Sequence, residues 1–230
     1  IARLLASLGS YAYSSNENSV WVHLYAGNSA NFTLGKKQVG IVQKTDYPWH
    51  EDIVFNVEPN EPTSFTLALR IPDWTSNPTI TVNDKIISPV FRNGYAQIKR
   101  TWQKSDKVTL TLPMSIKLIE ANPNVRQVAG HKAIQRGPII FCLEEVDNGR
   151  NLHDLTITDK PELTASFDKN LLGGTMVITG NAEKRKLTSW RNKLYSHEKS
   201  EKTAVKFKAI PYALWANRRP GEMRIWLNSR

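Results

Sequence analysis

Apolar residues recur along the chain with two different spacings, and the first spacing predicts a helix at the start. The opening apolar positions fall on one helical face: Ile1, Leu4, Leu5, Leu8 and Ala12. No Ser, Thr, Asp or Asn stands ahead of this stripe to cap its first turn. We therefore expect residues 1–14 to be the remnant of a larger helical unit.

After residue 18 the spacing changes to strict alternation, which predicts β-strands. The clearest alternating segments are "SVWVHLYAG" (19–27), "SFTLALRIP" (64–72) and "DKVTLTLPM" (106–114). Between them, Asn83-Asp84 and Asn93-Gly94 are typical of tight hairpin turns. Short strands at roughly ten-residue spacing favour an antiparallel sandwich over a parallel sheet with crossover helices.

The second half of the chain has a similar but less regular pattern. An apolar run, "PIIFCLEE" (138–145), predicts a buried strand, and Gly173-Gly174 separates two further strands. The final segment "GEMRIWL" (221–227) alternates like one well-formed strand. We therefore predict a mainly β chain of two antiparallel β-sandwich domains, at 19–115 and 116–230, preceded by the remnant helix.

Composition excludes several classes of protein and of site. The 230 residues are 40% apolar and 23% charged, which is normal for a globular chain. Without a run of about 18 apolar residues, no membrane span and no membrane partner are expected. Cys142 is the single cysteine, so this chain alone makes no disulfide and no cysteine-based zinc site. The five histidines lack metal-ligand spacing, and we expect no metal and no cofactor here.

The net charge of +10 lies mostly in the second half. Residues 1–115 carry 11 basic against 9 acidic residues, and residues 116–230 carry 20 against 12. A basic segment at 184–208, with Trp190 and Tyr195, suits a nucleic-acid binder or, alternatively, a solvated loop and strand edge. Because no RNA-binding or helix-turn-helix signature accompanies the charge, we favour the second interpretation and expect no nucleic-acid partner.

The most unusual segment is "QKTDYPWHEDIVF" (43–55), which concentrates aromatic and acidic side chains in one loop. Aromatic rings stack on sugar rings, and carboxylates and imidazoles bond their hydroxyls. The candidate carbohydrate contacts are Asp46, Tyr47, Trp49, His50 and Glu51. The alternative is that Tyr47 and Trp49 only fill the gap between the sheet and the neighbouring domain.

Five ordered motifs together resemble a known family. They are "TDYPWHEDIVFNV", "FTLALRIPDW", "NGYAQIKRTWQKSDKVTLTLPM", "AIQRGPIIFCLEEVDN" and "PYALWANRRPGEMRIWL". The chain is similar over most of its length to the C-terminal portion of bacterial β-L-arabinofuranosidases of glycoside hydrolase family 127.

The resemblance implies a catalytic (α/α)6 barrel upstream, followed by β-sandwich domains. It also implies a retaining hydrolysis by a cysteine thiolate, with zinc held by cysteines and a glutamate, all of them in that upstream barrel. No catalytic residue of the family falls on this chain, and Cys142 matches a strand position. The implied role is an accessory region of a glycoside hydrolase.

This accessory region would brace the catalytic barrel as its partner. It would meet the glycan substrate indirectly, shaping the cleft through residues 43–52. It would also offer its C-terminal domain for a homodimer. A free-standing carbohydrate-binding β-sandwich module stays open as the alternative function.

Overall fold

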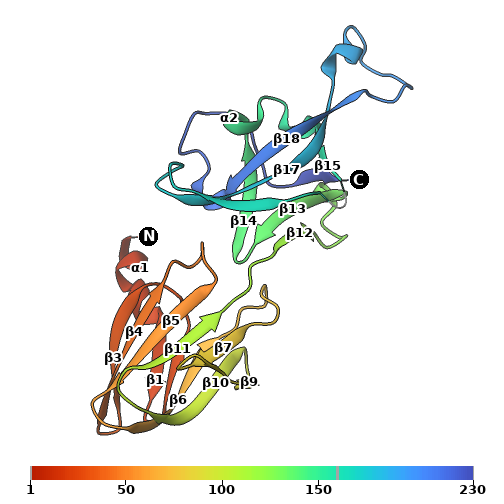
Figure 1. Ribbon diagram of the computed structural model, residues 1–230. Coiled ribbons are helices and arrows are strands. Elements are labelled where there is room, and N and C mark those ends of the chain that lie inside the picture. The colour runs from red at the N-terminus through yellow and green to blue at the C-terminus, as the bar shows by residue number, and fades with distance from the viewer. Residues whose placement is uncertain (1, 159–160, 230) are drawn as a thin grey trace. The chain divides into compact units, whose positions relative to one another are not determined.

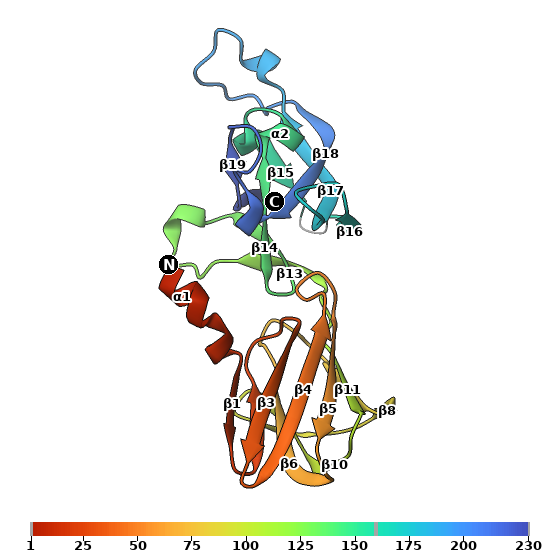
Figure 2. The same ribbon diagram turned by 90° about the vertical axis from the view of Figure 1, so that its left-hand side faces the viewer.

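The computed structural model describes residues 2–158 and 161–229, which form two compact units, residues 1–114 and 115–230 (Figures 1 and 2). Strands dominate both units, so the prediction of a mainly β chain is confirmed. The predicted N-terminal helix is present as α1 (Ala2–Ser7), which continues as a 3-10 turn, η1 (Leu8–Tyr11). Ile1, the first residue of the predicted stripe, lies outside the described residues.

The first unit contains two sheets, and their order departs from the order of the chain. One sheet contains, in spatial order, β1 (Tyr13–Asn16), β2 (Ser19–Val22), β6 (Thr63–Arg70), β10 (Tyr95–Trp102) and β9 (Val90–Arg92). The other contains β3 (Asn28–Leu34), β4 (Lys37–Thr45), β5 (Asp52–Pro59), β11 (Asp106–Thr111), β7 (Thr79–Val82) and β8 (Lys85–Ile86).

Both sheets send alternate side chains into a single core. Val20 and Leu67 from the first sheet and Ile41 and Phe55 from the second are each fully buried. This is the result that period-two alternation predicts, since every second side chain points to the same face. Trp102 is also fully buried, and its indole Nε1 donates a hydrogen bond of 3.1 Å to the Phe65 carbonyl oxygen.

The two predicted hairpins of the first unit are confirmed. Asn83 and Asp84 turn the chain between β7 and β8 with φ angles of 50° and 62°. Asn93 and Gly94 do the same between β9 and β10, with φ angles of 51° and 78°. Positive φ at both central residues is the requirement of a type I′ turn, which Asn, Asp and Gly meet at low cost.

The strands of the second unit belong to one sheet. They are β12 (Ile116–Glu120), β13 (His131–Arg136), β14 (Ile139–Glu144), β15 (Leu155–Ile157), β16 (Thr164–Asp168), β17 (Thr175–Arg185), β18 (Lys202–Pro211), β19 (Met223–Arg224) and β20 (Leu227–Ser229). Its helical turns are η2 (Arg126–Val128), α2 (Glu145–Asn148), η3 (Leu152–Asp154), η4 (Leu187–Trp190) and η5 (Tyr212–Leu214).

This second sheet closes on itself, which corrects the prediction of a second sandwich. Within the described ranges, β13 pairs with β20, then β15, β17, β18 and β14 follow, and β14 pairs back with β13. Alternation is the same in a sandwich and in a closed barrel, because both have one buried face. The strand pattern alone therefore does not distinguish them.

The last predicted strand is also different from the expectation. The segment 221–227 is interrupted after Arg224, and its two parts pair with different partners. β19 pairs with β14, whereas β20 pairs with β13 and, in parallel, with β15. The interruption lets one short segment supply β20 to the closed ring and β19 to the free side of β14.

Candidate functional site

The loop at 46–51, the candidate from the sequence, connects β4 to β5 in the first unit. Its backbone turns tightly, because the amides of Trp49 and His50 both donate to the Asp46 carbonyl oxygen, at 2.9 and 3.3 Å. Asp46 and His50 are exposed, whereas Trp49 is half-buried. The loop thus places three of the five candidate residues at or near the surface.

Tyr47 has a packing role. Its ring is half-buried and lies edge-on to Tyr25, with a centroid separation of 5.8 Å. The ring also stacks on Trp74, with a centroid separation of 6.5 Å. Burial raises the pKa of the Tyr47 hydroxyl, although the nearby Arg70 partly opposes that rise. The alternative interpretation from the sequence also gave Tyr47 a packing role, and both of these contacts lie within the first unit itself.

Glu51 fastens the loop to the end of the last core strand. Its Oε1 accepts a hydrogen bond of 2.8 Å from the Met114 amide. Its carbonyl oxygen accepts another, of 2.9 Å, from the Leu112 amide. These bonds tie Glu51 to the backbone of residues 112–114, and its proposed contact with sugar gains no support from them.

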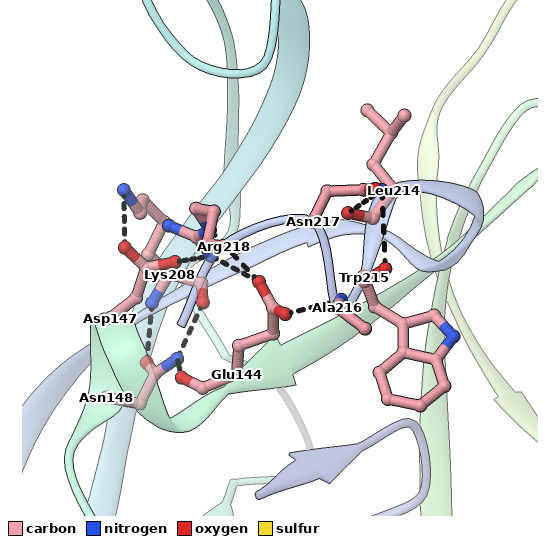
Figure 3. A network of polar contacts seen from close by, with 9 residues as sticks. All are labelled: Glu144, Asp147, Asn148, Lys208, Leu214, Trp215, Ala216, Asn217 and Arg218. Atoms are coloured by element: carbon pink, nitrogen blue, oxygen red, sulfur yellow. Dashed lines mark hydrogen bonds and ion pairs between the residues drawn. The ribbon is translucent and has the colours of Figure 1, made fainter. Parts of the chain in front are cut away.

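A second polar site, which the sequence did not indicate, lies in the second unit (Figure 3). Glu144 ends β14, Asp147 and Asn148 follow on α2, Lys208 belongs to β18, and Arg218 comes from the loop after η5. The carboxylates of Glu144 and Asp147 are mostly buried, and the guanidinium of Arg218 lies between them. We call these five residues the Arg218 network.

The charges of the network balance. Arg218 Nη2 donates to Asp147 Oδ2 at 2.5 Å and also to Glu144 Oε2, while its Nε donates to the same Glu144 oxygen at 3.2 Å. Lys208 Nζ lies 2.7 Å from the other Asp147 oxygen. Burial of the Asp147 carboxyl acts to raise its pKa, but the bonds from Arg218 and Lys208 outweigh it and leave the pKa below its usual value. The bond to Asp147 likewise raises the pKa of Arg218.

The network also holds the backbone of three segments together. Glu144 Oε1 accepts a hydrogen bond of 2.9 Å from the Ala216 amide. Asn148 Nδ2 donates to the carbonyl oxygens of Glu144 and Lys208, and its Oδ1 accepts from the Lys208 amide, all at 2.9 Å. The loop 212–222 is therefore fixed to β14, α2 and β18.

Sequence reasoning missed this network because its partners are about seventy residues apart. The predicted strand at 138–145 included both Glu144 and Glu145, whereas the strand ends at Glu144 and α2 begins at Glu145. A local signal was present: Glu144 and Asp147 are three residues apart, a spacing that places side chains on one side of a helical turn.

Cys142 is fully buried in β14, and burial raises the pKa of its thiol to about 12. A neutral, inaccessible thiol is a poor nucleophile and a poor metal ligand. Within residues 2–158 and 161–229, no group of three or more His, Cys, Asp or Glu side chains could hold a metal ion. In the same ranges, no helix has the length and apolar character needed to cross a bilayer.

The basic segment at 184–208 is largely paired within its own unit. Five of its cations form ion pairs with acidic side chains: Arg185 with Asp154, Lys186 with Glu201, Lys193 with Glu198, Lys202 with Glu183 and Lys208 with Asp147. Lys184 donates to the Arg150 carbonyl oxygen at 2.6 Å. This pattern agrees with the interpretation as a solvated strand edge, because paired cations leave less charge for phosphates.

These features define a β protein of two units, one with an aromatic loop and one with a buried ion network. Two family models match it: "Beta-L-arabinofuranosidase, GH127 middle domain" over residues 19–114 and "Glycoside hydrolase family 127 C-terminal domain" over residues 116–228. Together they account for most of the chain. The chain belongs to glycoside hydrolase family 127.

Individual relatives agree with this assignment. A non-reducing end β-L-arabinofuranosidase of Bifidobacterium longum subsp. longum is 31% identical over 98% of the chain. A GH127 β-L-arabinofuranosidase structure from Geobacillus stearothermophilus T6 matches 100% of the chain at 42% identity, with a TM-score of 0.96. A second GH127 β-arabinofuranosidase structure matches at 30% identity, with a TM-score of 0.89. The chain spans 36% of the length of each of the first two relatives.

The Arg218 network makes a prediction about pH. Asp147→Asn should lower the free energy of unfolding by about 1.5–3 kcal/mol at pH 7, because hydrogen bonds to charged groups contribute this much. The folded-state pKa of Asp147 lies below the unfolded value of about 3.9. The stability due to its ionisation is therefore fully present above that value, and is lost as the pH falls through the lower folded-state pKa. Urea unfolding between pH 7 and pH 2.5 measures the difference.

Asp84→Asn is the matched control. The Asp84 side chain is 82% exposed and pairs with Lys107 at 3.2 Å, so its loss should cost under about 1 kcal/mol. A stability difference between the wild type and Asp147→Asn that stays constant down to pH 2.5 would contradict the prediction.

Proposed function

We propose that this chain is the non-catalytic accessory region of a family 127 glycoside hydrolase of the β-L-arabinofuranosidase type. The observation that carries the proposal is that the chain matches the middle and C-terminal domain models of the family but spans 36% of the length of the relatives. The remaining length of those relatives supplies room for a catalytic barrel. In this proposal the division into 19–115 and 116–230 separates a β-sandwich brace from a second accessory domain.

The residues of this chain do not fit the zinc and thiolate chemistry that the family resemblance implies. Such a site needs several clustered ligands and an ionised thiol. The described residues offer no such cluster, and the thiol of Cys142 is buried with a raised pKa. We therefore assign zinc and the nucleophile to the catalytic barrel of the longer protein, and derive no chemical step from this chain.

The N-terminal helix supports contact with that barrel. Leu4, Leu5 and Leu8 are 59%, 64% and 48% exposed, and α1 has no buried residue within the described structure. Residues 2–18 precede both family models, yet the Geobacillus structure matches the whole chain. In our proposal α1 is a helix of the (α/α)6 barrel, and burial of each leucine contributes about 1.5–3 kcal/mol.

A chimera tests this proposal. Residues 2–229 replace the matching 36% of the Geobacillus enzyme, and release of p-nitrophenol from the aryl β-L-arabinofuranoside is measured. We expect the chimera to hydrolyse the substrate and the isolated 230-residue chain not to. Leu4→Ser combined with Leu5→Ser should lower the thermal midpoint and the activity of the chimera, because two buried side chains lose their apolar contacts.

Ile86→Ser is the matched control, because Ile86 is 80% exposed on β8 and its loss should change neither quantity. Hydrolysis by the isolated chain would overturn the non-catalytic assignment. If the two leucine substitutions change neither the thermal midpoint nor the activity of the chimera, the proposed contact between α1 and the barrel is wrong.

The loop 46–51 is, in our proposal, one rim of the substrate cleft. Trp49, Asp46 and His50 lie at or near the surface, and an aromatic ring beside polar groups suits a sugar. Trp49→Ala in the chimera should raise KM about ten-fold with little change in kcat, which is the pattern of lost substrate binding. An unchanged KM would contradict the proposal that this loop contacts the substrate.

The alternative function, a free-standing carbohydrate-binding module, is tested with the same Trp49→Ala substitution. It predicts that the isolated chain binds arabino-oligosaccharides and that Trp49→Ala abolishes the binding. Titration calorimetry of the isolated chain and its variant separates the two functions, since the accessory role requires no affinity of the isolated chain at this loop.

The C-terminal domain carries a surface that suits a homodimer. The chain between β17 and β18 extends away from the sheet (Figure 1), and Leu194 and Tyr195 on it are 89% and 92% exposed. Exposed apolar side chains favour association with a second copy. Sedimentation velocity should show a dimer that dissociates on Leu194→Ser with Tyr195→Ser, while Ile86→Ser has no effect. A chain that sediments as a monomer at every concentration would refute it.

A further inference from the structure

A pocket of about 290 Å³ lies beside the Arg218 network, within the second unit. Six side chains supply its chemistry: Glu144, Glu145, Trp215, Arg218, Arg219 and Glu222. The volume is at the lower end of the range for ligand sites, about 300–1,000 Å³, so it suits a compact ligand.

The charges around the pocket favour a ligand without net charge. Glu144 is paired with Arg218, and Glu145 lies 3.4 Å from the Nε of Arg150. Glu222 accepts hydrogen bonds from the backbone amides of Leu152 and Asn151, at 2.7 and 3.2 Å. The lining contains both glutamates and arginines, so neither an anion nor a cation meets an electrostatic field of one sign. Hydroxyl groups can donate to such carboxylates and accept from such guanidinium groups at once.

One wall of the pocket is aromatic. The Trp215 indole is 40% exposed and lies nearly parallel to the Tyr212 ring, with centroids 6.3 Å apart and planes 12° apart. Tyr212 itself is 42% exposed. Figure 3 shows the indole directed away from the Arg218 network, so its role is separate from those ion pairs. Exposed aromatic faces stack on the C–H faces of ring-shaped ligands.

The pocket has unused donors on a fixed loop. Arg219 is exposed, and no residue in the described ranges forms an ion pair or hydrogen bond with its side chain. The same holds for the indole Nε1 of Trp215. Their positions are nevertheless set, because the neighbouring residues Ala216 and Arg218 are bonded to Glu144. A site held in place before binding loses less entropy when a ligand binds.

We propose that this pocket is a saccharide-binding site that takes one neutral sugar residue of a glycan. The Trp215 ring stacks on the sugar face, Arg219 donates to its hydroxyls, and the carboxylates of Glu145 and Glu222 accept from them. The site is separate from the loop 46–51, which belongs to the other unit, and it does not depend on catalysis.

The test is an NMR titration of the full 15N-labelled chain with arabinotriose, and in parallel with xylotriose and cellotriose. We expect saturable shifts of the Ala216 and Gly221 amides and of the Trp215 indole with at least one of these sugars. Trp215→Ala and Arg219→Gln should each weaken the binding about ten-fold, the effect of losing one stacking or charged contact. Arg219→Gln changes an exposed side chain and leaves the fold intact, so it covers the case in which Trp215→Ala fails to fold.

Phe91→Ala is the control, because Phe91 is an aromatic side chain of the first unit that is 59% exposed, and its removal should leave the affinity unchanged. The proposal is overturned if none of the three sugars shifts these amides, or if Arg219→Gln binds as the wild type does. It is also overturned if the shifts fall only on the Trp49 indole and its neighbours, which would locate sugar binding at the loop 46–51 instead.

Discussion

The second unit depends on one guanidinium group shared by two mostly buried carboxylates. Arg218 meets both Glu144 and Asp147, and each of these would be strongly destabilising in that position without a cation, because a buried unpaired charge keeps its full desolvation cost. These bonds fix the position of Arg218 relative to β14 and α2, and the Ala216 amide bonds Glu144 as well. The conformation of the loop 212–222, and with it the pocket and the Trp215 wall, follows from this single placement. Asp147 in turn positions Lys208 and thus the end of β18.

Local chemistry made much of the first unit predictable. Asn83-Asp84 and Asn93-Gly94 each have positive φ angles in a two-residue turn. Asn, Asp and Gly favour this conformation, so both turns could be predicted from the residue types. Alternation likewise predicted strands at 64–72 and 106–114, and Leu67 and Leu110 in these segments are fully buried. What alternation does not encode is which strand pairs with which. β2 lies beside β6, more than forty residues later and in parallel, and β14 pairs back with β13 to close a ring. Such pairings depend on packing between residues that are far apart in the chain. A pattern read over a short stretch of sequence does not contain this information.

The two candidate sites differ in the same way, since one could be predicted from neighbouring residues and the other could not. The loop 46–51 was found from composition because its aromatic and acidic residues are neighbours in the chain. The Arg218 network was not found because Glu144 and Arg218 are separated by 74 residues and meet only after β18 and the loop 212–222 are in place. The N-terminal helix could be predicted because helical spacing is a local signal.

Two carbohydrate sites are therefore proposed on different physical grounds, and the grounds are unequal. In the loop 46–51, Tyr47 packs between Tyr25 and Trp74, and Glu51 bonds the backbone of residues 112–114. Two of the five groups chosen for sugar recognition are thus committed to the fold. In the pocket beside the Arg218 network, Glu144 and Arg218 make structural bonds, and so do Glu145 and Glu222. Arg219 and the Trp215 indole have no such commitment. Binding energy comes from groups that gain a partner only in the complex, and groups that are already bonded in the free protein contribute less. By that criterion, affinity at the pocket of the second unit comes mainly from Arg219 and the Trp215 indole. The loop 46–51 needs a further surface opposite it before it can hold a sugar, which suits a rim and not an independent site.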